Sequence, residues 1–153
     1  MKRSTYILAF MMLVSLSGVV FAESFKVYPG AKLEDIYTTK QSGVDSKMLK
    51  PLKIIIFTTN DFFENVVAFY RSNAKEYRMP GMEGKSMKLS SGQELREAYF
   101  ILDNAGDITT SEHWIKIQRP YLSRERTKEG FQGKYEAIRN VTAIIEEDKR
   151  GYP

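Results

Sequence analysis

The chain has no cysteine, a single histidine and no glycine-rich phosphate loop. The absence of cysteine excludes disulfides, thiolate metal sites and thiol catalysis. One histidine, His113, is too few for the usual structural zinc sites, which combine cysteine and histidine. The stretch GMEGKS at 81–86 lacks the spacing G-x-x-x-x-G-K-[ST] of a phosphate loop. We therefore expect no metal, no cofactor, and a stability that depends on an apolar core.

An excess of charge of one sign is also missing. The 153 residues contain 23 lysines and arginines against 19 aspartates and glutamates. Lys2 and Arg3 belong to a segment that we expect to be removed, which leaves a net charge of about +2. Domains that bind nucleic acid carry a strongly basic surface. We therefore do not expect a nucleic-acid partner.

The N-terminal residues have the layout of a secretory signal peptide. Lys2 and Arg3 precede an apolar run at 7–14, and small residues near Ala22 suit cleavage after that position. The apolar stretch 7–22 is shorter than the roughly 20 residues of a membrane-spanning helix. We expect a signal peptide at 1–22, a single domain at 23–153, a periplasmic or secreted location, and no membrane span after cleavage.

The apolar pattern predicts an α+β domain. Bulky, mostly β-branched residues at 52–59 predict a strand, and strands are also predicted at 95–103, 113–119 and 140–147. Apolar positions recur at helical spacing from about 61 to 78. The resulting order β-α-β-β-β predicts an antiparallel or mixed sheet of about four strands with one main helix packed on a face.

Two further segments are harder to assign. Leu33, Ile36 and Tyr37 have helical spacing, which predicts a short helix that Gly43 could end. The segment 121–138 is broken by Gly130 and Gly133, which predicts an irregular, basic connection.

The stretch TTNDFFENVVAFY at 58–70 places two carboxylates among aromatic residues. Asn60 or Asp61 is suited to cap the helix, and Glu64 lies three residues after Asp61, where it could bond the capping amide. A catalytic acid pair is the alternative. Capping is favoured because carboxylates in a first helical turn satisfy free amides and the helix dipole.

Four segments taken together carry a resemblance: VYPGAK at 27–32, TTNDFFENVVAFYR, GQELREAYFILD and WIKIQRPY. The chain resembles a group of small exported bacterial proteins of unknown function, which share a Tyr-Pro-Gly-Ala start and a D-x-F-x-x-V-V-x-F-Y helix. The resemblance covers most of residues 27–146. It implies an envelope location and an α+β domain, and it assigns no activity and no catalytic residue.

No nucleophile, base and orienting group can be assembled from the sequence. His113 is followed and preceded by residues that point to the opposite face of a strand, so Glu112 cannot easily orient it. The chain also lacks G-x-S-x-G. We therefore expect no catalytic residues, and the alternative is a small hydrolase or lyase that uses Asp61, Glu64 or His113.

A copper(I) site is a weaker hypothesis. Thioethers are soft ligands, and Met79, Met82 and Met87 fall in one predicted loop that His113 could complete. Loop methionines more commonly cover the edge of a core.

The segment 119–139, RPYLSRERTKEGFQGKYEAIR, interleaves basic and aromatic residues. Arginine beside aromatics suits carboxylates and phosphates, which it binds through forked hydrogen bonds. The alternative is a solvated loop whose charges only keep it soluble. We predict a non-enzymatic binding or scaffold domain for an anionic envelope ligand or protein, with these binding residues: Trp114, Arg119, Tyr121, Arg124 and Arg126.

Overall fold

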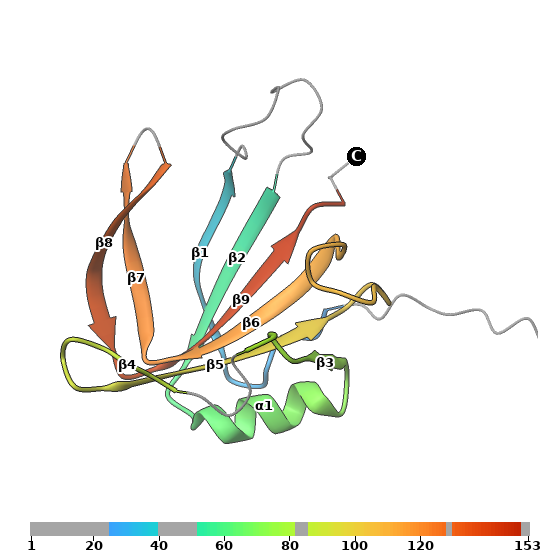
Figure 1. The fold of residues 1–153 in the computed structure, drawn as a ribbon, viewed down its shortest axis with the longest axis horizontal. Coiled ribbons are helices and arrows are strands. Elements are labelled where there is room, and N and C mark those ends of the chain that lie inside the picture. The colour runs from blue at the N-terminus through green and yellow to red at the C-terminus, as the bar shows by residue number, and fades with distance from the viewer. Residues whose placement is uncertain (1–24, 40–51, 82–85, 128–129, 151–153) are drawn as a thin grey trace, which may run out of the picture.

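The computed structural model describes residues 25–39, 52–81, 86–127 and 130–150, and within 124–136 only the backbone. Seven strands form one antiparallel sheet in the order β1-β2-β9-β6-β5-β3, with β4 paired to β5, and β7 and β8 form a separate hairpin (Figure 1). The elements are β1 (Lys32–Thr39), β2 (Leu52–Thr59), α1 (Phe63–Arg71), β3 (Lys75–Tyr77), β4 (Met87–Lys88), β5 (Glu94–Ile101), β6 (His113–Arg119), β7 (Tyr121–Thr127), β8 (Gly130–Arg139) and β9 (Thr142–Asp148).

The prediction of an α+β sheet of about four strands with one main helix is wrong, because the described residues form nine strands and one helix of nine residues. Strands β2, β5, β6 and β9 are the four that the sequence predicts. The segment expected to be a short helix at 33–43 instead begins as β1, which pairs with β2 along its length. The segment expected to be irregular at 121–138 forms the β7–β8 hairpin.

Helix α1 is shorter than its apolar spacing predicts. Its buried face agrees with the prediction, since Phe63, Val66, Val67 and Tyr70 are all buried. The helix ends at Arg71 because the next two side chains compete for its last carbonyls. The Ser72 hydroxyl and the Asn73 amide both donate to the carbonyl of Phe69, each at 2.7 Å. The chain then continues as β3 along the edge of β5.

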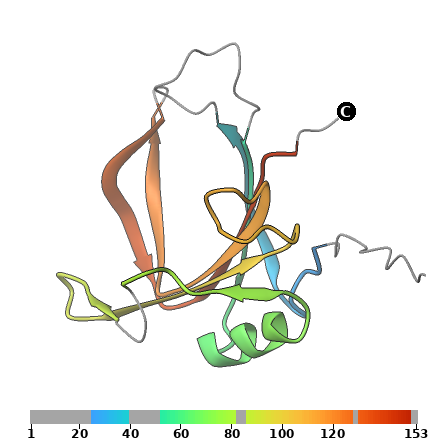
Figure 2. The same ribbon diagram turned by 45° about the vertical axis from the view of Figure 1, so that its right-hand side comes forward.

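The two faces of the sheet have different partners. Helix α1 covers one face, and the β7–β8 hairpin stands over the other (Figures 1 and 2). Alternation along β6 sends Ile115 and Ile117 into the cluster beneath α1, while Lys116 and Gln118 point to the hairpin side. On that side a second cluster contains Ile54 and Ile56 of β2 with Tyr121 of β7. Both faces of the sheet therefore contribute residues to a hydrophobic cluster.

The chain turns at Pro29 and Gly30. The amide of Ala31 donates to the carbonyl of Tyr28 at 3.0 Å, and Gly30 has φ +78°, which a side chain would strain. The turn places the Tyr28 hydroxyl in a hydrogen bond to the carboxylate of Asp61. This segment thereby ties the chain before β1 to the start of α1.

The prediction that Asn60 or Asp61 caps the helix is wrong. Phe62 occupies the N-cap and no side chain caps the helix. Asp61 instead accepts hydrogen bonds from Tyr28, from the side chain of Asn65 and from the amide of Phe62, in that order of effect, and these lower its pKa. Glu64 pairs with Arg96 of β5, whose hydrogen bond lowers the pKa of Glu64. The two carboxylates therefore bond different partners.

Asp103 organises the connection between β5 and β6. Its carboxylate accepts hydrogen bonds from the Ser111 hydroxyl at 2.9 Å and from the amides of Ala105, Glu112 and His113. Burial by itself raises the pKa of Asp103, but these donors outweigh it and hold the pKa below its usual value.

We expect the replacement Asp103→Asn to lower the free energy of unfolding by about 2 kcal/mol at pH 7. The amide oxygen is a weaker acceptor than a carboxylate oxygen, and the amide nitrogen donates hydrogen bonds where the second carboxylate oxygen accepted them. A lowered folded-state pKa gives stability that is present above the unfolded pKa of about 4 and is lost as the pH falls through the folded pKa. Urea unfolding at pH 7 and pH 3 would measure both effects. The stability lost through Asp103→Asn should be smaller at pH 3 than at pH 7. An equal loss of stability at both pH values would contradict the role of the ionised Asp103 carboxylate.

Candidate functional site

An open cleft of about 1250 Å³ lies between the hairpin-facing side of the sheet and the β7–β8 hairpin. Strands β1, β2, β5, β6 and β9 supply its floor, and β7, β8 and β4 supply the remaining walls. Among the described side chains, eight that line it are apolar, eight are polar or charged, and three are tyrosines. They are Leu52, Ile54, Ile56, Met87, Leu95, Leu122, Ala137 and Ile145; Glu34, Asp35, Glu97, Lys116, Gln118, Ser123, Arg139 and Glu147; and Tyr37, Tyr99 and Tyr121.

A hydrogen-bonded network crosses the floor of the cleft. The Glu97 carboxylate accepts from the Tyr99 hydroxyl at 2.8 Å and from the Gln118 amide at 3.1 Å. The ammonium of Lys116 lies 3.5 Å from the same carboxylate. Burial, followed by the charge of Glu97, raises the pKa of Tyr99, so this phenol stays protonated and acts as a donor. The network fixes the positions of polar groups that face the cleft.

Glu147 is the second carboxylate on the floor. It lies on β9 between Ile54 of β2 and Trp114 of β6, which are its directly paired residues. Burial raises its pKa, and the positive charges of Lys116 and Lys149 oppose that shift only in part. Within the described part of the chain, its carboxylate makes no hydrogen bond and no ion pair below 4 Å. Glu147 therefore presents an acid to the cleft with no direct partner.

One wall of the cleft joins the hairpin to the sheet edge. Arg139 of β8 forms an ion pair with Glu34 of β1 at 2.9 Å. Its guanidinium also lies 5.1 Å from the centre of the Tyr121 ring, a cation–π distance. The ion pair links β8 to β1, which are not hydrogen-bonded neighbours.

The predicted binding residues have different environments. Tyr121 lines the cleft. Trp114 lies on the same face of β6 as Lys116, with its ring 6.2 Å from that of Tyr99. Its buried indole N–H has no acceptor among the described residues.

Arg119 does not point toward the cleft. Its guanidinium donates to the carbonyls of Asp61 and Asn140 and to the Thr142 hydroxyl, at 2.7–3.1 Å. Arg119 therefore holds three connections together and is not free to bind a ligand.

The remaining two predicted binding residues, Arg124 and Arg126, belong to the part of β7 for which only the backbone is described. Their side chains lie outside the described residues. Their backbone positions pair with Tyr135 and Phe131 of β8, with irregular register on either side of Arg124.

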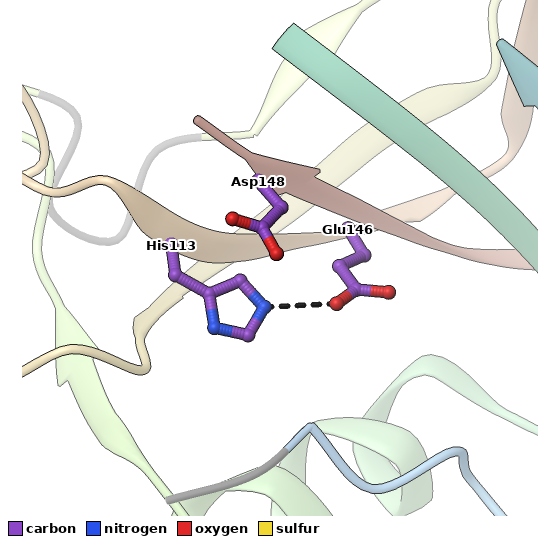
Figure 3. Close-up of side chains that lie close together, drawn as sticks. All are labelled: His113, Glu146 and Asp148. Carbon is purple, nitrogen blue, oxygen red and sulfur yellow. Dashed lines mark hydrogen bonds and ion pairs between the residues drawn. The ribbon is translucent and has the colours of Figure 1, made fainter. Parts of the chain in front are cut away.

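His113 lies on the face of β6 opposite to Lys116 and Gln118, which line the cleft. His113 and Glu146 are buried, and Asp148 lies beside them (Figure 3). The Nε2 atom of His113 is 2.8 Å from the Glu146 carboxylate, and the donor atoms of His113, Glu146 and Asp148 all fall within 4.8 Å of one another. Such a trio could hold a metal ion. Both oxygens of Asp148, however, accept from the Arg150 guanidinium at 2.8–2.9 Å, and Glu146 bonds His113. We interpret the group as a buried hydrogen-bonded pair beside a surface ion pair.

The residues of the enzymatic alternative do not converge. Asp61 lies beside Arg119 at one end of β6, and His113 lies at the other end, roughly 20 Å away along the strand. Glu64 forms an ion pair with Arg96. The proposed copper(I) ligands are not brought together either. Met87 lines the cleft, His113 faces the α1 side, and Met82 lies outside the described residues.

Sequence reasoning missed the polar floor of the cleft. The sequence did contain a sign of this floor, because polar residues alternate with core residues along three strands. They are Glu97 and Tyr99 on β5, Lys116 and Gln118 on β6, and Glu147 on β9. A polar face on a strand ordinarily indicates contact with water. Here the hairpin covers that face, and nothing in the local pattern reveals such a cover.

No helix among the described residues has the length and apolar character needed to cross a bilayer. Comparisons with protein-family profiles, with curated proteins and with solved structures found no match to this chain, so its function is argued from the cleft itself.

Proposed function

We propose that the protein is an exported, non-enzymatic binding protein that holds an amphipathic small molecule in the cleft between the sheet and the β7–β8 hairpin. The observation that carries the proposal is the cleft. Ligand sites are typically concave, with volumes of roughly 300–1,000 Å³ and a few fixed polar groups on apolar walls. The cleft is slightly larger than that range and has both kinds of lining.

The balance of the lining supports an amphipathic ligand. Met87 of β4 presents an apolar side chain to the cleft that is 52% exposed, whereas Ile54, Ile56 and Leu122 form a packed floor and keep only 6–7% of their surface exposed. Covering residual apolar surface favours binding by about 25 cal/mol per Å². The polar groups of Glu97 and Gln118 are held by hydrogen bonds, so they would orient a ligand without losing mobility on binding.

Export remains part of the proposal and is supported by the N-terminal pattern up to Ala22. A binding role is favoured over hydrolysis because the candidate acids and His113 lie on different elements and make structural contacts. An anionic ligand, as the basic segment suggests, would have to reach Arg124 or Arg126.

The proposal predicts that filling the cleft abolishes binding. Ala137 of β8 lines the cleft and is exposed, so Ala137→Trp should occupy the space without disturbing the core. Its neighbour Ile138 is 39% exposed and does not line the cleft, which makes Ile138→Trp a matched control. The probe is N-phenyl-1-naphthylamine, a neutral molecule that fluoresces in apolar surroundings.

Wild-type protein and Ile138→Trp should bind the probe saturably, and Ala137→Trp should bind it at least tenfold more weakly, because the new indole takes the space. Thermal unfolding of each variant would establish that all are folded. Equal probe binding by the two tryptophan variants, or no saturable binding by folded wild-type protein, would overturn the proposal.

A further inference from the structure

Resting on the proposed function, we infer that the ligand of the cleft is an amphipathic cation, an elongated apolar molecule that carries an amine. This ligand class is opposite in charge to the partner that the basic segment 119–139 suggests. The inference comes from the described charges that line the cleft and from how they are paired.

The described lining contains more acids than bases. Four acidic side chains face the cleft against two basic ones. Both bases are already paired, since Lys116 lies 3.5 Å from Glu97 and Arg139 lies 2.9 Å from Glu34. No described basic side chain of the lining is therefore left to receive a carboxylate or phosphate.

Two acids of the lining, Asp35 and Glu147, take no part in these two ion pairs. Asp35 accepts a hydrogen bond from the amide of Ile36, which leaves Glu147 as the candidate for a ligand. Its carboxylate opens into the cleft, and its immediate strand neighbours are Ile54 and Trp114. Burial makes an acid in such surroundings costly to ionise, and the charges of Lys116 and Lys149 offset that cost only in part. A further cation close to the carboxylate would favour its charged form. An ammonium group could donate hydrogen bonds to this carboxylate and supply the missing charge.

The apolar part of the ligand has a defined place. From Glu147 the floor continues along β9 to Ile145 and across β2 to Ile54 and Ile56, with Leu122 on the hairpin. A charged head at Glu147 would therefore place an alkyl or aromatic body over these four side chains. Such an arrangement separates the roles of the lining: the acid selects charge, and the apolar residues add affinity.

The inference is tested by three probes that share one ten-carbon chain: decylamine, 1-decanol and decanoate. Each competes with N-phenyl-1-naphthylamine at pH 7. Decylamine should compete about tenfold more tightly than decanol, the effect of one partly buried ion pair, and decanoate most weakly. Glu147→Gln should reduce the advantage of decylamine over decanol to within about threefold. Glu94→Gln alters an exposed acid outside the cleft and should leave the advantage intact.

The outcomes separate this inference from the proposed function. If the naphthylamine probe binds but decylamine has no advantage over decanol, or if decanoate competes best, the cation inference is overturned and the binding function stands. If Glu147→Gln retains the advantage while remaining folded, Glu147 is not the selecting group and the inference is also overturned. If the probe does not bind to wild-type protein, the proposed function fails first.

Discussion

Replacing Arg119 by alanine is expected to lower the free energy of unfolding by about 3 kcal/mol, and the melting temperature by roughly 10 °C. The guanidinium donates to the carbonyls of Asp61 and Asn140 and to the hydroxyl of Thr142. The Thr142 hydroxyl itself donates to the carbonyl of Asp61 at 2.7 Å. Truncation therefore removes a donor from the part-buried Asp61 carbonyl and Thr142 hydroxyl and from the exposed Asn140 carbonyl. The end of β6 then loses its side-chain link to the connection after β2 and to the one before β9.

Two further variants sharpen the test of Arg119. Arg119→Lys keeps the charge but loses the planar fork, so it should recover less than half of the lost stability. Arg71→Ala is a control, because Arg71 is an exposed arginine with a surface ion pair to Glu76 and should cost less than 1 kcal/mol. Urea unfolding of the three variants measures these differences. If Arg119→Ala were as stable as Arg71→Ala, Arg119 would not have the structural role that its contacts indicate.

The buried pair of His113 and Glu146 should give the second large effect. Their side chains are 1% and 9% exposed. Glu146→Ala leaves the imidazole without its partner in an apolar layer, so we expect a loss of about 3 kcal/mol. The combined replacement His113→Phe with Glu146→Leu removes both polar groups and should cost much less than the sum of the single losses.

Urea unfolding of the two single variants and the double variant measures the coupling between His113 and Glu146. We expect a coupling energy of about 1–3 kcal/mol. Strictly additive losses would show that the 2.8 Å contact contributes nothing to stability. A Zn²⁺-dependent rise in melting temperature that disappears in Glu146→Gln would instead identify a metal site with Asp148 as the third ligand.

Part of the fold could be predicted from short-range pattern alone. The residues of β2, β5, β6 and β9 have enough bulky or alternating apolar positions to be assigned to strands correctly. The apolar face of α1 was also predictable, since each buried position recurs at helical spacing. The end of α1 was not, because it depends on which carbonyls Ser72 and Asn73 bond, and on the pairing of β3 with β5.

The elements that were missed gain their stability from pairing. β1 leaves Leu33 and Ile36 about half exposed, so burial does not select its conformation and its pairing with β2 does. The β7–β8 hairpin contains Gly130 and Gly133 and a high density of charge, which weaken any strand signal. Hydrogen bonds between the two strands outweigh these local preferences.

Sequence alone was enough to exclude disulfides and thiol chemistry and to locate the four strongest strands and the apolar face of α1. Which polar residues matter depends instead on contacts between distant segments. Arg119 became a structural clamp because three chain connections meet at its side chain. Glu97, Lys116 and Glu147 became a candidate site because a hairpin distant in sequence covers their face of the sheet. Local pattern records the period of a strand, whereas the cover over a face depends on contacts between segments far apart in the chain.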